Sequence, residues 1–229
     1  MSRTLTIILG VIFSVQAIGE VVINEIAATH VPRNLRWDQN DQAYSGSGPA
    51  WWSASFDDSR WLSGNLPMGY SLGRIATDLG SELRSISPSF YVRKNFEVST
   101  SEAASSAPMI LEINYNDGFI AWINGVEVAR GNMGAAKAHI YHDQLSHRGS
   151  TLGTNSESIT LPIASELLIR GKNIIAIQVN NLTLTGNMRL EMSLRIDEPS
   201  GADPQLFSSG SAVTYLPGLR EPSSGLVDP

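Results

Sequence analysis

An Asn-Gly dipeptide between two apolar runs is the feature that most narrows the folds open to this chain. Asn124 and Gly125 follow the apolar run 119–123, and residues 126–130 return from them. Asn-Gly favours the positive backbone angles of a two-residue turn whose twist matches that of paired strands. The sequence therefore predicts a β-hairpin here, and with it an antiparallel sheet.

Alternating apolar and polar residues predict further strands around this hairpin. Phe90, Val92 and Phe96 share one face of segment 90–98, opposite Arg93 and Glu97. This period of two is typical of a half-buried strand. Similar or fully apolar segments lie at 109–115, 158–163, 173–180 and 189–196. With seven or eight strands and no helix of three turns, the expected fold is an all-β, jelly-roll β-sandwich with long loops.

Composition and charge exclude several functions. Cysteine is absent, which removes thiolate metal sites, cysteine nucleophiles and redox couples. The 22 acidic residues outnumber the 16 lysines and arginines. The chain therefore lacks the basic surface that a nucleic acid requires, and no nucleic-acid partner is expected.

The N-terminus indicates export. Arg3 precedes an apolar run at 5–15, and small residues precede a cleavage point after Ala17. Residues 1–17 are therefore expected to be a signal peptide, too short to anchor the chain in a membrane. No membrane span is expected after cleavage. An exported chain without cysteine suggests a secreted or cell-envelope protein of a bacterium.

Four regions are expected along the chain. After the signal peptide, residues 18–34 would form an N-terminal strand and lead-in, and residues 35–198 the sandwich. Segment 199–229 contains five Pro, four Gly and six Ser among its 31 residues. This composition predicts a linker or tail, and hence neighbouring domains in a larger protein.

Several short motifs occur in an order that resembles a known family. They are FDDSRW at 56–61, PMGY at 67–70, YVRKNF at 91–96, YNDGF at 115–119, INGVEVAR at 123–130 and GKN at 171–173. Together they resemble the galactose-binding-domain-like jelly-roll modules of exported multidomain bacterial proteins. They are similar to the sugar-binding accessory domain of family 2 glycoside hydrolases. The resemblance implies a galactose-binding-like sandwich without catalytic residues. A short stretch beginning at Val21 also resembles the opening strand of lamin-tail domains.

Tryptophans are the main candidates for sugar binding. Trp51, Trp52 and Trp122 are expected to stack on sugar rings, with Asn124 fixing hydroxyl groups. Aromatic side chains also bury large apolar areas, so the same rings could anchor long loops to the sandwich instead.

Asn116 and Asp117 are the candidate metal ligands. Amide and carboxylate oxygens are ligands suited to Ca²⁺, and PA14-type lectins have a comparable Asp-Asp pair. The alternative is a plain β-turn with Gly118 at a positive backbone angle. His139, His142 and His147, near Asp143, form only a weak zinc pattern and are expected to be solvated loop residues. No other cofactor is expected.

The sequence contains no recognisable catalytic group. Asp57 and Asp58 are adjacent and predict a turn rather than a pair of glycosidase carboxylates. We therefore expect a non-catalytic module that binds a polysaccharide or other glycan. The alternatives are an accessory domain of a glycoside hydrolase whose catalytic part lies elsewhere, and a structural spacer or interaction domain.

Overall fold

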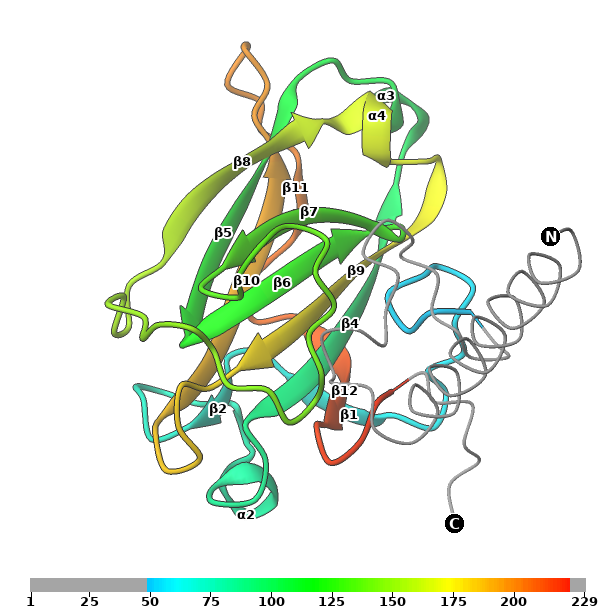
Figure 1. The fold of residues 1–229 in the computed structure, drawn as a ribbon. Coiled ribbons are helices and arrows are strands. Elements are labelled where there is room, and N and C mark those ends of the chain that lie inside the picture. The colour runs from blue at the N-terminus through cyan, green and yellow to red at the C-terminus, as the bar shows by residue number, and fades with distance from the viewer. Residues whose placement is uncertain (1–48, 223–229) are drawn as a thin grey trace, which may run out of the picture. The chain divides into compact units, whose positions relative to one another are not determined.

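Two β-sheets packed face to face form the fold in the computed structural model, which describes residues 49–222 (Figure 1). One sheet has the order β1-β12-β4-β9-β6-β7, and the other has β3-β2-β10-β5-β8, with β11 pairing β10. The strands are β1 Leu62–Asn65, β2 Met68–Tyr70, β3 Thr77–Asp78, β4 Ser89–Val98, β5 Pro108–Asn116, β6 Gly118–Ile123, β7 Val126–Gly131, β8 Glu157–Ile163, β9 Gly171–Asn180, β10 Met188–Ile196, β11 Gln205–Phe207 and β12 Ala212–Pro217. The helices are the single turns α2 Gly80–Leu83, α3 Thr100–Ala103 and α4 Ala164–Leu167.

The predicted all-β sandwich is confirmed. All strand pairs are antiparallel except the short parallel pair β2–β3. Consecutive strands such as β4 and β5, or β5 and β6, lie in different sheets, so the chain crosses repeatedly between the layers as in a jelly roll. The predicted hairpin joins β6 to β7, with Asn124 at φ 50° and Gly125 at φ 93°.

The main core lies between the two sheets. On β4, Phe90, Val92 and Phe96 point inward, as the alternation predicts. On β10 the inward residues include Leu190 and Met192. These residues are almost completely buried, and their removal from water is the main force that holds the two layers together.

A second apolar cluster covers the outer face of the first sheet. It contains Tyr91 of β4, Ile120 and Trp122 of β6, and residues from two loops. One loop is 49–61 and the other is 132–156, which contains no strand or helix. In Figure 1 the second loop, drawn in light green after β7, passes in front of β6 and β9. The central strands β4, β9 and β6 of this sheet are therefore largely buried on both faces.

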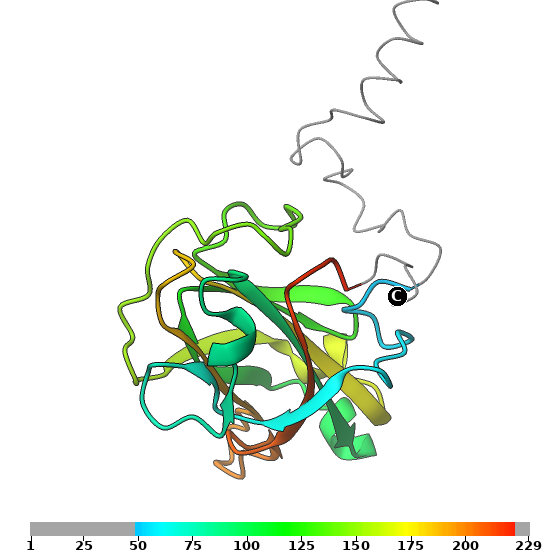
Figure 2. The same cartoon turned by 90° about the horizontal axis from the view of Figure 1, so that it is seen from below.

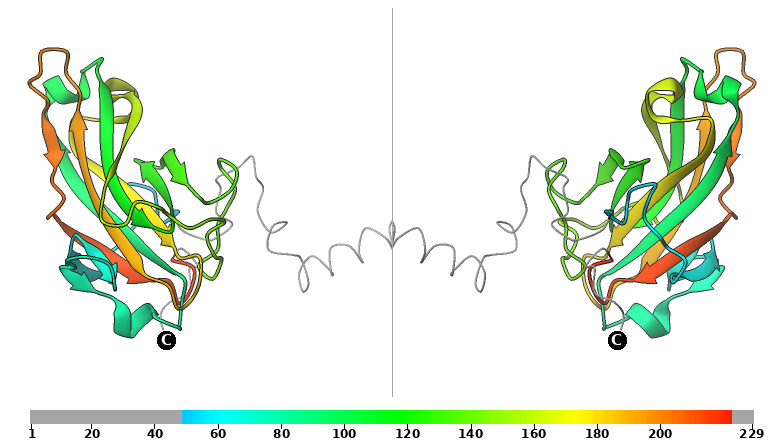
Figure 3. Two further views of the ribbon diagram at one scale, coloured as in Figure 1. Left: turned by 90° about the vertical axis from the view of Figure 1, so that its left-hand side faces the viewer. Right: turned by 90° about the vertical axis from the view of Figure 1, so that its right-hand side faces the viewer.

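The C-terminal segment corrects the predicted domain boundary. Residues 199–229 were expected to be a linker, yet β12 pairs with both β4 and β1. Figure 2 shows β1 in cyan beside β12 in orange-red, and the side views in Figure 3 show β12 among the other strands. Val213 and Tyr215 of β12 are buried in the main core. Neighbouring strands supply the hydrogen bonds and apolar contacts that this composition alone did not suggest, so the sandwich extends beyond residue 198.

The N-terminal predictions lie outside the described residues. They are the signal peptide 1–17, the lead-in 18–34 and the lamin-tail-like start at Val21. None of the helices in residues 49–222 has the length and hydropathy of a membrane span.

Candidate functional site

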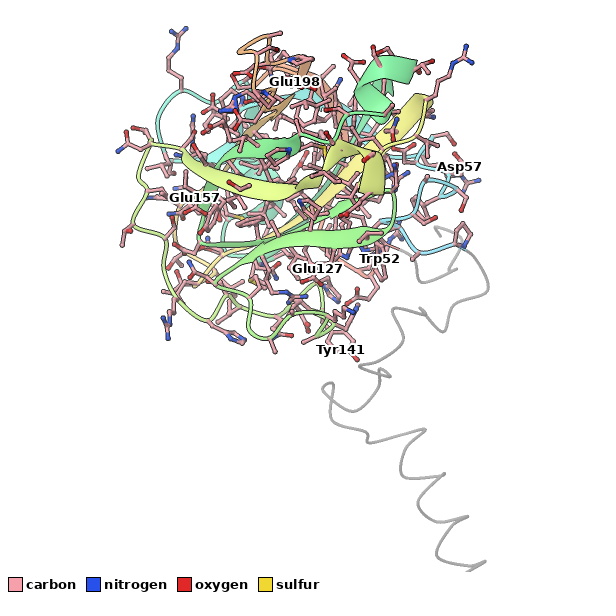
Figure 4. The ribbon with its side chains drawn as sticks, turned by 90° about the horizontal axis from the view of Figure 1, so that it is seen from above. Trp52, Asp57, Glu127, Tyr141, Glu157 and Glu198 are labelled. Atoms are coloured by element: carbon pink, nitrogen blue, oxygen red, sulfur yellow. The ribbon has the colours of Figure 1, made fainter. Side chains whose placement is uncertain are left out.

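The tryptophans predicted to bind sugar lie buried against one another. Trp51, Trp52 and Trp122 are 2%, 7% and 6% exposed. Trp52 stacks on Trp122 with ring centroids 5.4 Å apart, and Trp51 meets Trp122 edge-on at 5.2 Å. Figure 4 shows Trp52 on the same side of the sandwich as Glu127 and Tyr141. The rings anchor loop 49–61 to the sheet, and none of these three is open to stack on a sugar.

Asn124 is also held by neighbouring residues. Its Nδ2 donates to Asn173 Oδ1 at 2.7 Å and to the Leu167 carbonyl at 2.9 Å. Its Oδ1 accepts from the Ile174 N–H at 3.0 Å. These bonds tie the tip of the β6–β7 hairpin to β9, so the side chain is committed to the fold.

Arg93 joins two of the motifs that carried the family resemblance. Its Nε donates to Asp58 Oδ2 at 3.0 Å, although its side chain is only 2% exposed. The same guanidinium donates to the carbonyls of Trp51, Ser53 and Phe56. Burial lowers the pKa of Arg93, and Asp58 opposes that effect. The FDDSRW and YVRKNF motifs therefore meet in a structural contact, while Asp57 forms the predicted turn by accepting from the Ser59 N–H.

Asn116 and Asp117 connect the end of β5 to two loops. Asp117 Oδ1 accepts from the Ser150 N–H at 3.0 Å, and Oδ2 accepts from the Leu182 N–H at 2.9 Å. Asn132 Nδ2 donates to the Asp117 carbonyl at 2.9 Å. Both carboxylate oxygens therefore have partners within the protein, and the calcium hypothesis needs a direct test.

Replacing Asp117 with alanine is expected to lower the free energy of unfolding by about 2 to 3 kcal/mol, because two backbone N–H groups lose a charged acceptor. The melting temperature would fall by about 4 to 12 °C for a unit of this size. Thermal melts with and without a chelator measure this. If Asp117 has only a structural role, the melting temperature of the variant should lie below that of the wild type by the same amount with and without chelator. If Asp117 binds calcium, chelator should lower the melting temperature of the wild type and leave that of the variant unchanged. A variant as stable as the wild type would contradict the structural role.

The histidines of loop 132–156 do not form a metal-binding group. His139 Nε2 lies 3.9 Å from Glu221 Oε2, and the His142 N–H donates to Glu221 Oε1 at 2.8 Å. Burial, together with Arg130, lowers the pKa of His139 to about 3, so its imidazole is neutral near pH 7. Within residues 49–222, no three His, Asp or Glu side chains are placed to hold a metal ion.

A polar pocket that the sequence did not predict lies on the outer face of the second sheet. On β10, Leu190 and Met192 point into the core, so the alternate residues Arg189 and Glu191 face outward. Arg189 is nevertheless only 4% exposed. Two loops cover it: residues 71–76, between β2 and β3, and residues 152–155, before β8.

The covering loops meet over the Arg189 guanidinium. Nη1 donates to the carbonyls of Leu72 and Arg74, both at 2.9 Å, and Nη2 donates to Glu191 Oε2 at 2.5 Å. A Cβ added to Gly73 would lie 2.9 Å from Thr154 Cγ2 and 3.3 Å from Arg189 Nη1. Glycine at position 73, with φ at 66°, therefore favours this close approach, because a larger residue would be strained and would displace Thr154.

Two buried polar atoms near this point lack partners among the described residues. They are Arg189 Nε and Oδ1 of Asn114, which lies opposite Glu191 on β5. The Asn114 amide nitrogen is satisfied, because it donates to the carbonyls of Gly153 and Asn155 in the covering loop. A buried donor without a partner costs about 1 to 3 kcal/mol, so each such atom needs an explanation, which a bound water or ligand can supply.

The pocket beside Arg189 has a volume of about 570 Å³. We call it the Arg189 pocket; it is lined by Pro67, Arg74, Ile75, Ala76, Thr154, Arg189 and Glu191. Its lining combines two arginine guanidinium groups, one carboxylate and one hydroxyl with three apolar side chains. Its size is within the range of small-molecule sites.

A second groove of about 550 Å³ lies between β4 and β11. Lys94 lines it from the inward face of β4, with Phe96 and Phe207 as aromatic walls. Its two lysines, Lys94 and Lys172, are both partly or fully exposed. The Arg189 pocket differs because its central charged group is buried and donates hydrogen bonds to the carbonyls of loop 71–76.

Comparisons with known proteins assign no family to the chain. No family model and no curated protein matches it. Similar solved structures include an α-L-rhamnosidase from Aspergillus terreus, at 19% identity and a TM-score of 0.36 over 56% of this chain. A lectin from Pleurotus ostreatus in complex with GalNAc matches 78% of this chain, at 14% identity and a TM-score of 0.38. A Bacteroides uniformis β-glucuronidase matches 76% of this chain, at 13% identity and a TM-score of 0.38. The chain covers only 15%, 42% and 26% of these three proteins, respectively.

Proposed function

We propose that this chain is a non-catalytic carbohydrate-binding module of an exported bacterial protein, and that the Arg189 pocket is its binding site. The observation that carries the proposal is a buried arginine with an unused donor, Nε, in a pocket of about 570 Å³. The expected signal peptide at 1–17 supports the exported location. The family resemblance of the sequence supports a role beside other domains.

The chemistry of the pocket suits a sugar ring. Each ring hydroxyl both donates and accepts hydrogen bonds, and the pocket offers donors on Arg189, an acceptor on Glu191 and both on Thr154. The ring also has apolar C–H faces, which Pro67 and Ile75 can contact. A pocket with both kinds of surface orients a ligand by a few polar groups set among apolar ones.

The same pocket does not suit glycoside hydrolysis. Most glycosidases use two carboxyl groups on opposite sides of the scissile bond. Glu191 is the single carboxylate among the described residues that line the pocket, and it is paired with Arg189. Binding is therefore the proposed role, and an accessory position beside a hydrolase is compatible with it.

Calorimetric titration of the full chain with oligosaccharides from plant and algal polysaccharides tests the proposal. Arg189→Gln is expected to weaken binding by at least about tenfold, because it removes charged donors from a buried site. Glu191→Gln keeps the size of the side chain and is also expected to weaken binding. Thermal melts of both variants identify any loss of folding.

Arg195→Gln is the matched control. Arg195 lies on the same outer face of β10 as Arg189, but it is more exposed and pairs with Asp197. Its replacement should leave affinity unchanged. The proposal would be overturned by the absence of binding to every oligosaccharide tested, or by affinity that survives both pocket substitutions.

A further inference from the structure

The charged groups of the Arg189 pocket do not balance. The Arg189 guanidinium and Glu191 form an ion pair at 2.5 Å, so their charges offset each other. Arg74 lines the same pocket, is exposed, and forms no ion pair with any described residue. The lining therefore has one positive charge in excess, although the whole chain has a formal charge of −6.

The position of Arg74 is fixed by the fold. Its own carbonyl, and that of Leu72, accept hydrogen bonds from Arg189 Nη1. The base of the loop is closed where the N–H groups of Ala76 and Thr77 donate to the Pro67 carbonyl, at 2.7 and 3.2 Å. The backbone that carries the Arg74 side chain is therefore held at the rim before a ligand arrives, which lowers the entropy cost of binding.

Hydrogen-bond donors also exceed acceptors in this pocket. Arg189 Nε has no partner among the described residues, and the guanidinium of Arg74 adds five N–H donors. The side-chain acceptors are Glu191, which already accepts from Arg189, and the Thr154 hydroxyl. A ligand group that only accepts, and that is negatively charged, would correct both imbalances at once.

We propose that the Arg189 pocket selects saccharides that contain a uronic acid, with the sugar carboxylate bound by Arg74. This rests on the proposed sugar-binding function and specifies its ligand class. A carboxylate accepts two parallel N–H bonds from the planar guanidinium, an arrangement stronger than bonds between neutral groups.

Matched pairs of ligands test the charge directly. Oligosaccharides of galacturonate, glucuronate and mannuronate are each titrated into the full chain beside their methyl esters, which keep the ring and remove the charge. At least one acid is expected to bind about tenfold more tightly than its ester, as a charged hydrogen-bonded pair predicts. The preference should decrease at high salt, because Arg74 is exposed and the pair is screened.

Arg74→Gln should reduce the preference for the acid to less than about twofold, because it weakens binding of the acid more than binding of the ester. Arg170→Gln is the control, since Arg170 is also exposed and forms no ion pair with a described residue. Esters that bind as tightly as acids, or an Arg74→Gln variant that keeps the preference, would overturn this inference and leave the sugar-binding function intact. Failure of acids, esters and neutral oligosaccharides alike would overturn both.

Discussion

A chain that ends at residue 200 is expected not to fold. It would lack β11 and β12, whose residues Phe207, Val213 and Tyr215 are buried in the main core. It would also leave residues 90–93 of β4 without the hydrogen-bonding partner that β12 provides. The free energy of unfolding of a domain is only about 5 to 15 kcal/mol. Loss of three buried side chains, together with β12, which lies between β1 and β4, would remove an amount close to that free energy.

Circular dichroism and thermal melting of the truncated and full chains measure this effect. The full chain should show a cooperative transition, and the truncated chain should show none. Leu219→Ala is a control in the same segment, because Leu219 is 58% exposed and its replacement should change stability by less than about 0.5 kcal/mol. A truncated chain that melts cooperatively would restore the prediction of a linker over residues 199–229.

Arg93→Met is expected to lower the free energy of unfolding by about 3 to 5 kcal/mol, the usual effect of removing one partner from a buried ion pair. Asp58 would lose its counter-ion, and the carbonyls of Trp51, Ser53 and Phe56 would lose their donor. Because these residues belong to loop 49–61, the loop should loosen and expose Trp51. Denaturant unfolding gives the stability, and tryptophan emission should shift to longer wavelength.

The matched control is Arg195→Met. The side chains of Arg195 and Asp197 are 30% and 47% exposed, so their ion pair contributes less than about 1 kcal/mol. If Arg93→Met and Arg195→Met lower the free energy of unfolding by the same amount, Arg93 does not anchor loop 49–61 through its buried hydrogen bonds.

The central strands could be predicted from sequence because their own residues carry the signal. Alternation defined β4, β5 and β10, and Asn124 with Gly125 defined the β6–β7 hairpin. The short strands β1, β2, β3, β11 and β12 were missed because they lie in segments rich in Gly, Pro and Ser. Their extended form depends on partners far away in sequence, such as the pairing of Tyr215 with Leu62 and Val92.

The candidate site was harder to predict, because residue type does not determine exposure. Trp52 and Trp122 were candidates for sugar stacking, but each covers the other in the folded chain. The Arg189 pocket exists because loops 71–76 and 152–155 meet, which depends on tertiary structure. The available signal was the alternation of β10, which places Arg189 and Glu191 together on a polar face.

Chemical-shift mapping of the full chain, titrated with the tightest-binding oligosaccharide, tests the central claim most directly. The Arg189 pocket predicts changes at the Nε–H signal of Arg189 and the backbone amide of Thr154. The indole N–H signals of Trp122 on the other sheet, and of Trp51 and Trp52 in the loop that covers that sheet, should remain unchanged. Changes confined to those indole signals, with Arg189 and Thr154 unaffected, would contradict the account and place sugar binding at the aromatic cluster.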